Sequence, residues 1–98
     1  MEPLTSGQRK YLRSMAHHLD PVVLIGKQGV TEAVIHSIDE VLTAQELIKI
    51  RFNEHKDEKK ALCAEIEQRA GAGVAGIIGH IAILYRPHPD EEKRKITL

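Results

Sequence analysis

The chain has 98 residues, 42% hydrophobic and 29% charged, so it is long enough for one domain of ordinary globular composition and too short for two. Its 14 basic and 14 acidic residues give a formal net charge of zero, without the overall basicity that is usual in nucleic-acid-binding domains. The single cysteine excludes an internal disulfide, and two tyrosines, one phenylalanine and no tryptophan argue against a surface that stacks bases on exposed rings.

The first predicted element is an amphipathic helix that begins after Thr5. Thr5 and Gln8 have the spacing of a capping box, in which each side chain accepts a hydrogen bond from the other residue's backbone amide. The apolar stripe of this helix consists of Leu12, Met15, Ala16 and Leu19. We expect Asp20 and Pro21 to end the helix, because the residue before a proline is pushed to extended geometry.

A short apolar run at residues 22–25 predicts a strand that is buried on both faces. The run stops at a loop made of Gly26, Lys27, Gln28 and Gly29. Thr31 then has the character of an N-cap for a second helix. The buried stripe of that helix is predicted from Val34, Ile35, Ile38, Val41 and Leu42.

The second half of the chain predicts a strand, a helix and a hairpin. In the strand at residues 46–52, Ile48, Ile50 and Phe52 face one way, and Leu47, Lys49 and Arg51 face the other. A third helix spans about residues 57–70 and ends at Gly71. Strands at residues 74–78 and 81–86 form a hairpin around the turn Gly79-His80. The charged tail at residues 88–98 is expected to add a short edge strand at residues 96–98.

Strands that alternate with helices and end in a hairpin predict a single α/β domain over residues 1–98. The expected order is α-β-α-β-α-β-β, with one mixed four-stranded sheet packed with three helices.

The loop of Gly26, Lys27, Gln28 and Gly29 is the main candidate site. Two glycines remove Cβ atoms where a phosphate must approach the backbone, and the following helix adds the positive end of its dipole. Lys27 supplies a mobile positive charge, and this is how a GXXG loop clamps a nucleotide backbone. The competing interpretation is a strand-to-helix turn that needs glycine only for its backbone conformation. The dinucleotide fingerprint and the P-loop are both absent.

Three separated segments carry a resemblance to a known family. They are residues 12–32, which include the glycine loop, then residues 46–50, and last residues 78–79 followed by 83–87. In this order they resemble the CRM-domain family, in particular its stand-alone bacterial YhbY-like members. The resemblance implies a fold like the C-terminal domain of translation initiation factor three. It also implies RNA binding, association with precursors of the large ribosomal subunit, and a role in ribosome biogenesis.

The resemblance also implies a set of RNA-binding residues. Gly26, Lys27, Gln28 and Gly29 match the clamping loop, and a basic first helix is matched by Arg9, Lys10 and Arg13. Lys49, Arg51 and Arg86 are strand positions expected to extend the same patch. Lys49 and Arg51 can meet RNA if their face of the sheet is open; if a helix covers it, they must lie at its margin or pair with acidic residues. An alternative for the charges of the first helix is a solvated face without a ligand. An alternative for Arg86 is an edge-strand charge that discourages aggregation.

Other function classes find little support in the sequence. The six histidines are scattered, and none lies at a familiar spacing for a metal ligand. Cys63 is expected to be a small core residue, and no nucleophile–base pair is apparent, so we predict neither catalysis nor a cofactor. No apolar stretch is long enough to span a bilayer, and no secretory signal is apparent, so we expect a cytoplasmic monomer.

Two hypotheses follow. The first is an RNA-binding protein that clamps the RNA backbone, acting on ribosomal RNA or a large-subunit precursor. The second is a protein-interaction adaptor on ribosomal particles, in which the glycine loop has only a structural role.

Overall fold

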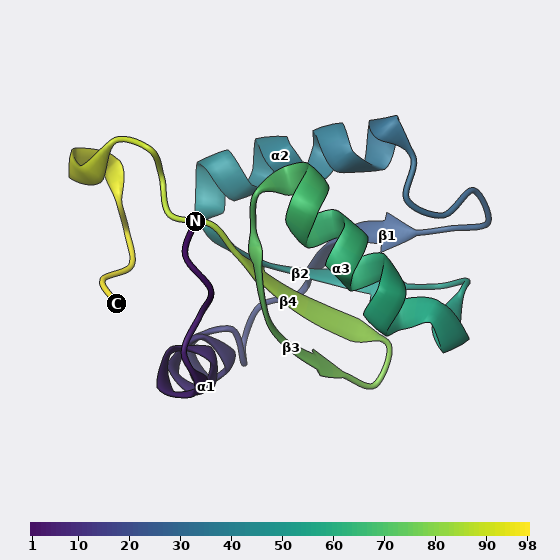
Figure 1. Cartoon of the computed structure of the whole chain (residues 1–98), viewed down its shortest axis with the longest axis horizontal. Coiled ribbons are helices and arrows are strands. Elements are labelled where there is room, and N and C mark those ends of the chain that lie inside the picture. The colour runs from purple at the N-terminus through teal and green to yellow at the C-terminus, as the bar shows by residue number, and fades with distance from the viewer.

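The computed structural model describes residues 1–98 and contains one four-stranded mixed sheet with helices on both faces (Figure 1). The elements are α1 (Ser6–Met15), β1 (Pro21–Ile25), α2 (Glu32–Gln45), β2 (Leu47–Phe52), α3 (Lys59–Ala70), β3 (Gly73–Ile78) and β4 (Ile81–Tyr85). The strand order in the sheet is β1-β2-β4-β3, with β1 parallel to β2 and the other pairs antiparallel. The predicted α/β class, element order and four-stranded sheet are therefore confirmed.

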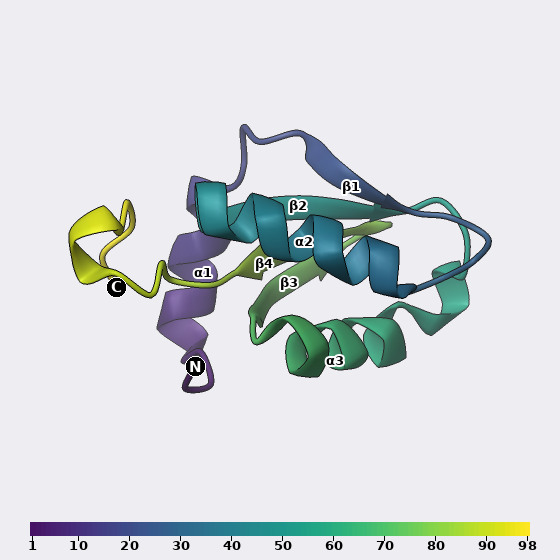
Figure 2. The same ribbon diagram turned by 90° about the horizontal axis from the view of Figure 1, so that it is seen from above.

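The main core lies between the sheet and the pair α2 and α3, which cover the same face (Figure 2). On β2, Ile48, Ile50 and Phe52 are buried in this core, as their alternation predicted. From α2, Ile38 and Leu42 are fully buried against them. Burial of such aliphatic and aromatic side chains stabilises the fold by about 1.5–3 kcal/mol for each side chain.

Helix α1 packs on the opposite face and covers only one end of the sheet (Figure 2). It builds a smaller core in which Leu12 and Ala16 contact the strand residues Ala75, Ile83 and Tyr85. Both chain termini lie at this end, whereas the loop between β1 and α2 lies at the other (Figure 1). The sheet therefore has one fully covered face and one half-covered face.

Strand β1 is an edge strand, and the prediction that both its faces are buried was wrong. Val23 and Ile25 lie in the main core, but Val22 and Leu24 are 44% and 56% exposed. Their face of the sheet is the one that α1 covers only at its far end. A continuous apolar run does not distinguish a strand with two covered faces from one whose outer face stays open.

Helix α1 begins as predicted and ends earlier than predicted. The capping box between Thr5 and Gln8 is present, with both hydrogen bonds formed. The helix stops at Met15, well before Pro21. The ammonium group of Lys49 donates hydrogen bonds to the carbonyl oxygens of His17 and Leu19, at 3.3 Å and 2.9 Å. These bonds satisfy carbonyl groups of the segment that leads down to β1, so the segment does not need to be helical.

The C-terminal tail is held by a buried carboxylate and does not form the expected edge strand. Glu46 is only 1% exposed, and its side chain accepts hydrogen bonds from the backbone amides of His88, at 2.9 Å, and Lys95. A 3-10 turn occupies Glu91–Lys93, and Ile96 is buried in the smaller core. Because Glu46 accepts the amides of His88 and Lys95 and most amides between them bond within the tail, the tail packs as an irregular strap.

The hairpin turn at the end of β3 has the predicted form. Gly79 has a φ of 60°, and His80 after it does not have a positive φ. This is the pattern of a two-residue turn with glycine first, in which a residue with a Cβ atom is strained. The tip of this hairpin lies at the same end of the sheet as the carboxyl end of β2, where the amide of Phe52 donates to the carbonyl oxygen of His80 at 2.8 Å.

Candidate nucleic-acid interface

The glycine loop exposes its first three residues, buries Gly29, and is closed by a single backbone hydrogen bond. The amide of Gly29 donates to the carbonyl oxygen of Gly26 at 3.0 Å, while the amides of Lys27 and Gln28 make no hydrogen bond within the chain. Gly26, Lys27 and Gln28 are all exposed to solvent. Two adjacent amide donors and one ammonium group are therefore available to an anion from outside.

The fold makes different demands at the two glycine positions of the loop. Gly29 has a φ of 73°, so the fold itself favours glycine there. Gly26 does not have a positive φ, and a Cβ atom built on it would meet no atom within 4 Å. Nothing inside the chain requires glycine at Gly26, where the open space faces solvent. The structural interpretation of the loop accounts for Gly29, and Gly26 is left free for close approach of a ligand.

The segment between β2 and α3 packs against the glycine loop and forms hydrogen bonds with it and with the end of β1. His55 Nε2 lies 2.8 Å from the carbonyl oxygen of Lys27, and the same ring covers Gly29. The amides of Asn53 and Glu54 donate to the carbonyl oxygen of Ile25 at 3.0 Å and 3.2 Å. Sequence reasoning missed His55, because its contact with the loop joins residues 28 positions apart.

Acidic residues limit the positive potential around the loop. Glu32 occupies the first turn of α2, and the Thr31 side chain already accepts the amide of Val34 at 3.1 Å. Glu54 and Glu58 belong to the supporting segment, where Glu58 lies 3.9 Å from His55 Nδ1. The anion-binding capacity of this end therefore depends on the loop amides and Lys27 more than on the helix dipole.

A second group of cations surrounds the hairpin tip beside the loop. Lys59 donates a hydrogen bond to the carbonyl oxygen of Gly79, and its Nζ lies 3.2 Å from His80 Nδ1. Desolvation and the positive charges of Lys59, Lys56 and Arg51 lower the pKa of His80 below its ordinary value. The backbone amide of Phe52 donates to the carbonyl oxygen of His80, and Phe52 is the sheet partner of Ile25, the residue before the loop. The loop and the hairpin tip therefore lie at the same edge of the sheet.

Lys56 and Lys59 were not among the residues that the sequence singled out. The signal available was a lysine-rich start of the third helix, which on its own is typical of a solvated helix end. These lysines become part of a common surface with the hairpin only because the β3–β4 turn packs against the start of that helix. We call Arg51, Lys56, Lys59 and His80 the tip cluster.

The basic residues of α1 lie at the other end of the sheet from the loop (Figures 1 and 2). Arg13 is half-buried, and its Nη1 donates to the carbonyl oxygen of Ala75 at 2.8 Å. Arg9 Nη1 donates to the carbonyl oxygen of Leu4 at 2.7 Å. Lys10 is exposed. The fold therefore separates the basic residues of α1 from the glycine loop by the length of the sheet.

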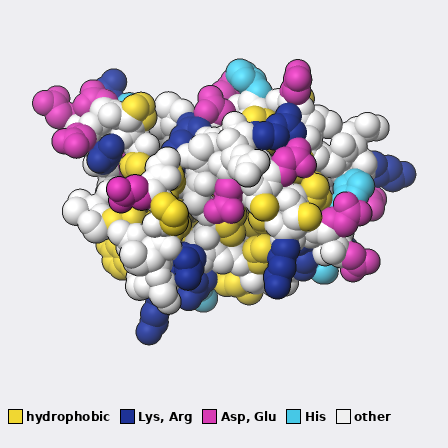
Figure 3. Space-filling view, in the orientation of Figure 1, with side chains coloured by type: hydrophobic (Ala, Val, Ile, Leu, Met, Phe, Trp, Pro, Cys, Tyr) yellow, Lys and Arg dark blue, Asp and Glu magenta, His cyan; other side chains and the backbone are white.

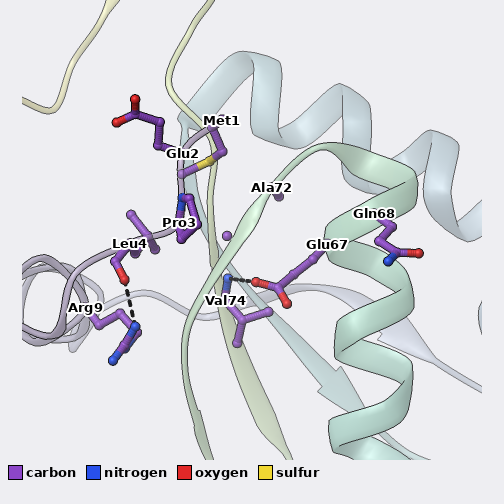
Figure 4. A pocket seen from close by; sticks show the side chains of 10 residues that line it. Met1, Glu2, Pro3, Leu4, Arg9, Glu67, Gln68, Ala72 and Val74 are labelled. Atoms are coloured by element: carbon purple, nitrogen blue, oxygen red, sulfur yellow. Dashed lines mark hydrogen bonds between the residues drawn. The ribbon is translucent and has the colours of Figure 1, made fainter.

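Arg9 also borders a shallow pocket between the N-terminal segment and the end of α3 (Figure 4). The pocket has a volume of about 410 Å³, and its lining includes Glu67 and Gln68. The Glu67 carboxylate accepts the amide of Val74 at 3.1 Å (Figure 4). This pocket contains no convergent basic groups and is remote from the glycine loop.

The three site residues that were predicted to lie on strands have three different surroundings, and Arg86 follows directly after β4. Lys49 is tied to the segment before β1, and Arg51 is exposed beside the tip cluster's other members. Arg86 is an internal connector whose side chain is only 18% exposed. It donates to Asp39 Oδ1 at 2.7 Å, to Thr43 Oγ1 at 2.9 Å and to the carbonyl oxygen of Ala70 at 2.8 Å. These bonds join α2 to the end of α3 and leave Arg86 little capacity for a ligand.

Cys63 is a core residue of α3. It is 3% exposed, and burial together with the charge of Glu67 raises the pKa of its thiol to about 11. A protonated, buried thiol is a poor nucleophile. No three His, Cys, Asp or Glu side chains lie close enough together to hold a metal ion, and no helix has the length and apolar character needed to cross a membrane.

Comparison with known proteins identifies the family. A family model described as the CRS1 / YhbY (CRM) domain matches residues 4–86. An RNA-binding protein of Haemophilus influenzae is 37% identical over 99 residues, which cover 100% of this chain and 97% of the relative. A Bacillus subtilis protein named "Probable RNA-binding protein YqeI" is 36% identical over 97% of this chain and 98% of its own length.

A solved structure supports the same assignment. The solution structure of a Staphylococcus aureus protein matches with a TM-score of 0.80 and 34% sequence identity, over 96% of this chain and 99% of that protein. Both chains are therefore similar in fold along almost their entire lengths. The chain belongs to the CRS1/YhbY (CRM) domain family.

Proposed function

We propose that this protein binds RNA by its sugar-phosphate backbone, with the glycine loop as the central contact. The observation that carries the proposal is the pair of unbonded amides at Lys27 and Gln28, next to an open Gly26. A phosphate oxygen accepts hydrogen bonds from such amides, and the ammonium group of Lys27 neutralises part of its charge. The names of the Haemophilus and Bacillus relatives point to the same ligand.

The proposed surface continues from the loop to the tip cluster. Lys27, Arg51, Lys56 and Lys59 lie at the same end of the sheet and supply positive charge along one edge. Lys10 adds an exposed charge at the α1 end, while Arg9, Arg13 and Lys49 contribute charge from anchored positions. Arg86 is left out, because its guanidinium group is occupied by α2 and α3.

The biological target that we propose is ribosomal RNA, in the context of large-subunit precursors in the cytoplasm. This proposal rests on the family and on the mode of contact, which addresses phosphates and so suits a large structured RNA. The protein acts as a monomer and performs no bond chemistry of its own.

Ultraviolet crosslinking in cells, followed by sequencing of the attached RNA, tests the proposed target. We expect enrichment of large-subunit ribosomal RNA and loss of crosslinks in the Lys27→Ala protein. Recovery of unrelated RNAs alone would contradict the ribosomal target.

Gradient sedimentation of ribosomal particles separates RNA binding from the adaptor hypothesis. Lys27→Glu should release the protein from particles, whereas Glu40→Lys on the exposed side of α2 should leave association intact. If Lys27→Glu stays on the particles and RNA binding is lost in solution, the protein is held by a protein partner and the adaptor hypothesis is favoured.

A further inference from the structure

A row of exposed side chains crosses the half-covered face of the sheet next to the glycine loop. Leu24 of β1 pairs with Arg51 of β2, Arg51 pairs with Ile81 of β4, and Ile81 pairs with Ile78 of β3. All four point away from α2 and α3, and we call them the open row. Leu24, near the end of the edge strand β1, and Ile78, the last residue of the edge strand β3, are 56% and 61% exposed, so the row presents aliphatic surface to solvent at both of its ends.

The open row begins where the cover of α1 ends. Two residues further along β4, Ile83 is fully buried against α1, whereas Ile81 is only half-buried. Val22, which precedes Leu24 on the same face of β1, is also exposed. The lower edge of the molecule in Figure 3, where the β3–β4 hairpin lies in Figure 1, shows hydrophobic side chains beside Lys and Arg.

The charges along the open row favour an anionic partner. Arg51 is its only charged member, and Lys56 and Lys59 border it at the loop end. No acidic residue belongs to the row. Because neighbouring strands are about 4.8 Å apart, the row spans roughly 14 Å from β1 to β3.

The size of the open row argues against a protein as its partner. Three aliphatic side chains and one arginine offer far less than the roughly 800 Å² that each partner contributes to a standard protein interface. In other RNA-binding modules, one face of a four-stranded sheet holds two or three unpaired bases. The width of the open row is suited to a ligand of that size.

We propose that the open row binds the bases of an unpaired RNA strand whose phosphates run along the glycine loop and the tip cluster. Leu24, Ile78 and Ile81 contact the apolar faces of the bases, and the planar guanidinium group of Arg51 stacks on a base or donates to its edge. A duplex keeps its bases stacked inside, so the protein prefers single-stranded RNA. The proposal rests on the proposed RNA-binding function and names the form of RNA that the surface accepts.

The scarcity of aromatic residues does not oppose this proposal. Phe52 and Tyr85 are buried and Tyr11 lies on α1, so the open row itself offers no ring for base stacking, which is the common arrangement for single-stranded nucleic acids. Contact with aliphatic side chains contributes less affinity for each base than stacking on a ring does, and it gives only a weak sequence preference. The phosphate contacts at the loop then supply the salt-dependent part of the affinity, and the open row supplies the preference for unpaired bases.

Fluorescence anisotropy with three RNA probes tests the proposal. The probes are a short uridine-rich strand without secondary structure, an abasic strand of equal length, and a duplex that contains the first strand. We expect the full-length protein to bind the uridine-rich strand about tenfold more tightly than either of the other two, which corresponds to about 1.4 kcal/mol.

The variant Leu24→Thr/Ile78→Thr should remove that preference. Threonine keeps the preference for strand structure while it replaces exposed apolar surface by a hydroxyl group, so the sheet is retained. The affinity for the abasic strand and the slope of affinity against salt should not change. Leu98→Thr, at a similarly exposed aliphatic residue in the tail, is the matched control and should behave as the unmodified protein. Thermal melts followed by circular dichroism test whether both variants are folded. If Leu24→Thr/Ile78→Thr does not fold, Leu24→Ala/Ile78→Ala takes its place.

Each outcome decides a separate question. Equal affinity of the unmodified protein for the uridine-rich and abasic strands overturns the open row as a base-binding surface, as does a preference that survives in the double variant. A double variant that keeps its preference for unpaired RNA and no longer binds a ribosomal protein would also overturn the open row as a base-binding surface. Absence of binding to all three probes would instead refute the proposed function, and this proposal with it.

Discussion

The imidazole ring of His55 holds the backbone of Lys27 through a contact of 2.8 Å between Nε2 and the carbonyl oxygen. A carbonyl group only accepts hydrogen bonds, so His55 carries a proton on Nε2 in either charge state of the ring. His55 itself has a left-handed backbone with a φ of 56°. The bond fixes the direction of the peptide units on which the two free amides of the loop depend.

Replacement of His55 should loosen the loop without unfolding the domain. His55→Asn keeps a residue that tolerates the left-handed backbone but cannot reach the Lys27 carbonyl oxygen with the same geometry. We expect faster hydrogen exchange at the Gly29 amide and RNA binding weakened about fivefold, since one net hydrogen bond is worth about 1 kcal/mol. His36→Asn on the exposed face of α2 is the control. Unchanged exchange at Gly29 in His55→Asn would show that the loop is rigid by itself.

Removal of the Lys27 charge should reduce the dependence of RNA binding on salt. Each phosphate contact contributes roughly 0.7–0.9 to the slope of log K against log salt concentration. Lys27→Ala is therefore expected to lower the slope by about that amount and to weaken binding to all RNA sequences alike. Anisotropy titrations at several salt concentrations measure both effects, with Lys93→Ala in the tail as control. An identical slope in Lys27→Ala would remove this residue from the interface.

Substitutions of Arg86 and Arg51 should have different effects, one on the stability of the fold and the other on RNA binding. Arg86→Gln removes the ionic contact with Asp39 and bonds to α2 and α3, so we expect a loss of about 2–3 kcal/mol in the free energy of unfolding. Arg51→Gln, at an exposed residue, should leave stability within about 0.5 kcal/mol and weaken RNA binding. Urea denaturation and RNA titration of both variants measure the contrast. The reverse assignment, with Arg86→Gln stable and defective in binding, would contradict the internal role of Arg86.

Cys63 gives the stability a dependence on alkaline pH. The pKa of its thiol in the folded protein is about 11, above the ordinary value of 9.0, so the folded state binds this proton more tightly than the unfolded state. Its contribution is complete below the unfolded pKa and is lost as the pH rises from about 9 to about 11. Unfolding by urea at several pH values should show a steeper decline in the natural protein than in Cys63→Ala. Parallel declines would mean that Cys63 titrates alike in both states.

The parts of the fold that depend on near neighbours in sequence were predicted correctly. The caps at Thr5 and Thr31 and the turn at Gly79 are set by residues within a few positions, and the sequence pattern is sufficient there. The face of β2 followed from simple alternation. The end of α1 did not, since it depends on Lys49, which reaches His17 and Leu19 from another strand.

The candidate site was predictable only at its loop. The four loop residues are contiguous, and the two-glycine pattern is visible in the sequence. The contribution of His55, and the approach of Lys59 to the hairpin tip, arise from contacts between segments 20 or more positions apart. The separation of α1 from the loop has the same origin, because sequence order says nothing about which end of a sheet a preceding helix covers.

Both chain termini lie at the α1 end, opposite the glycine loop (Figure 1). A fluorophore, an affinity tag or a further protein module joined to either terminus would therefore extend away from the ligand-facing edge. The same geometry allows several copies of this fold to be strung along one polypeptide, each with its loop unobstructed, so that weak single contacts with one long RNA combine into strong overall attachment.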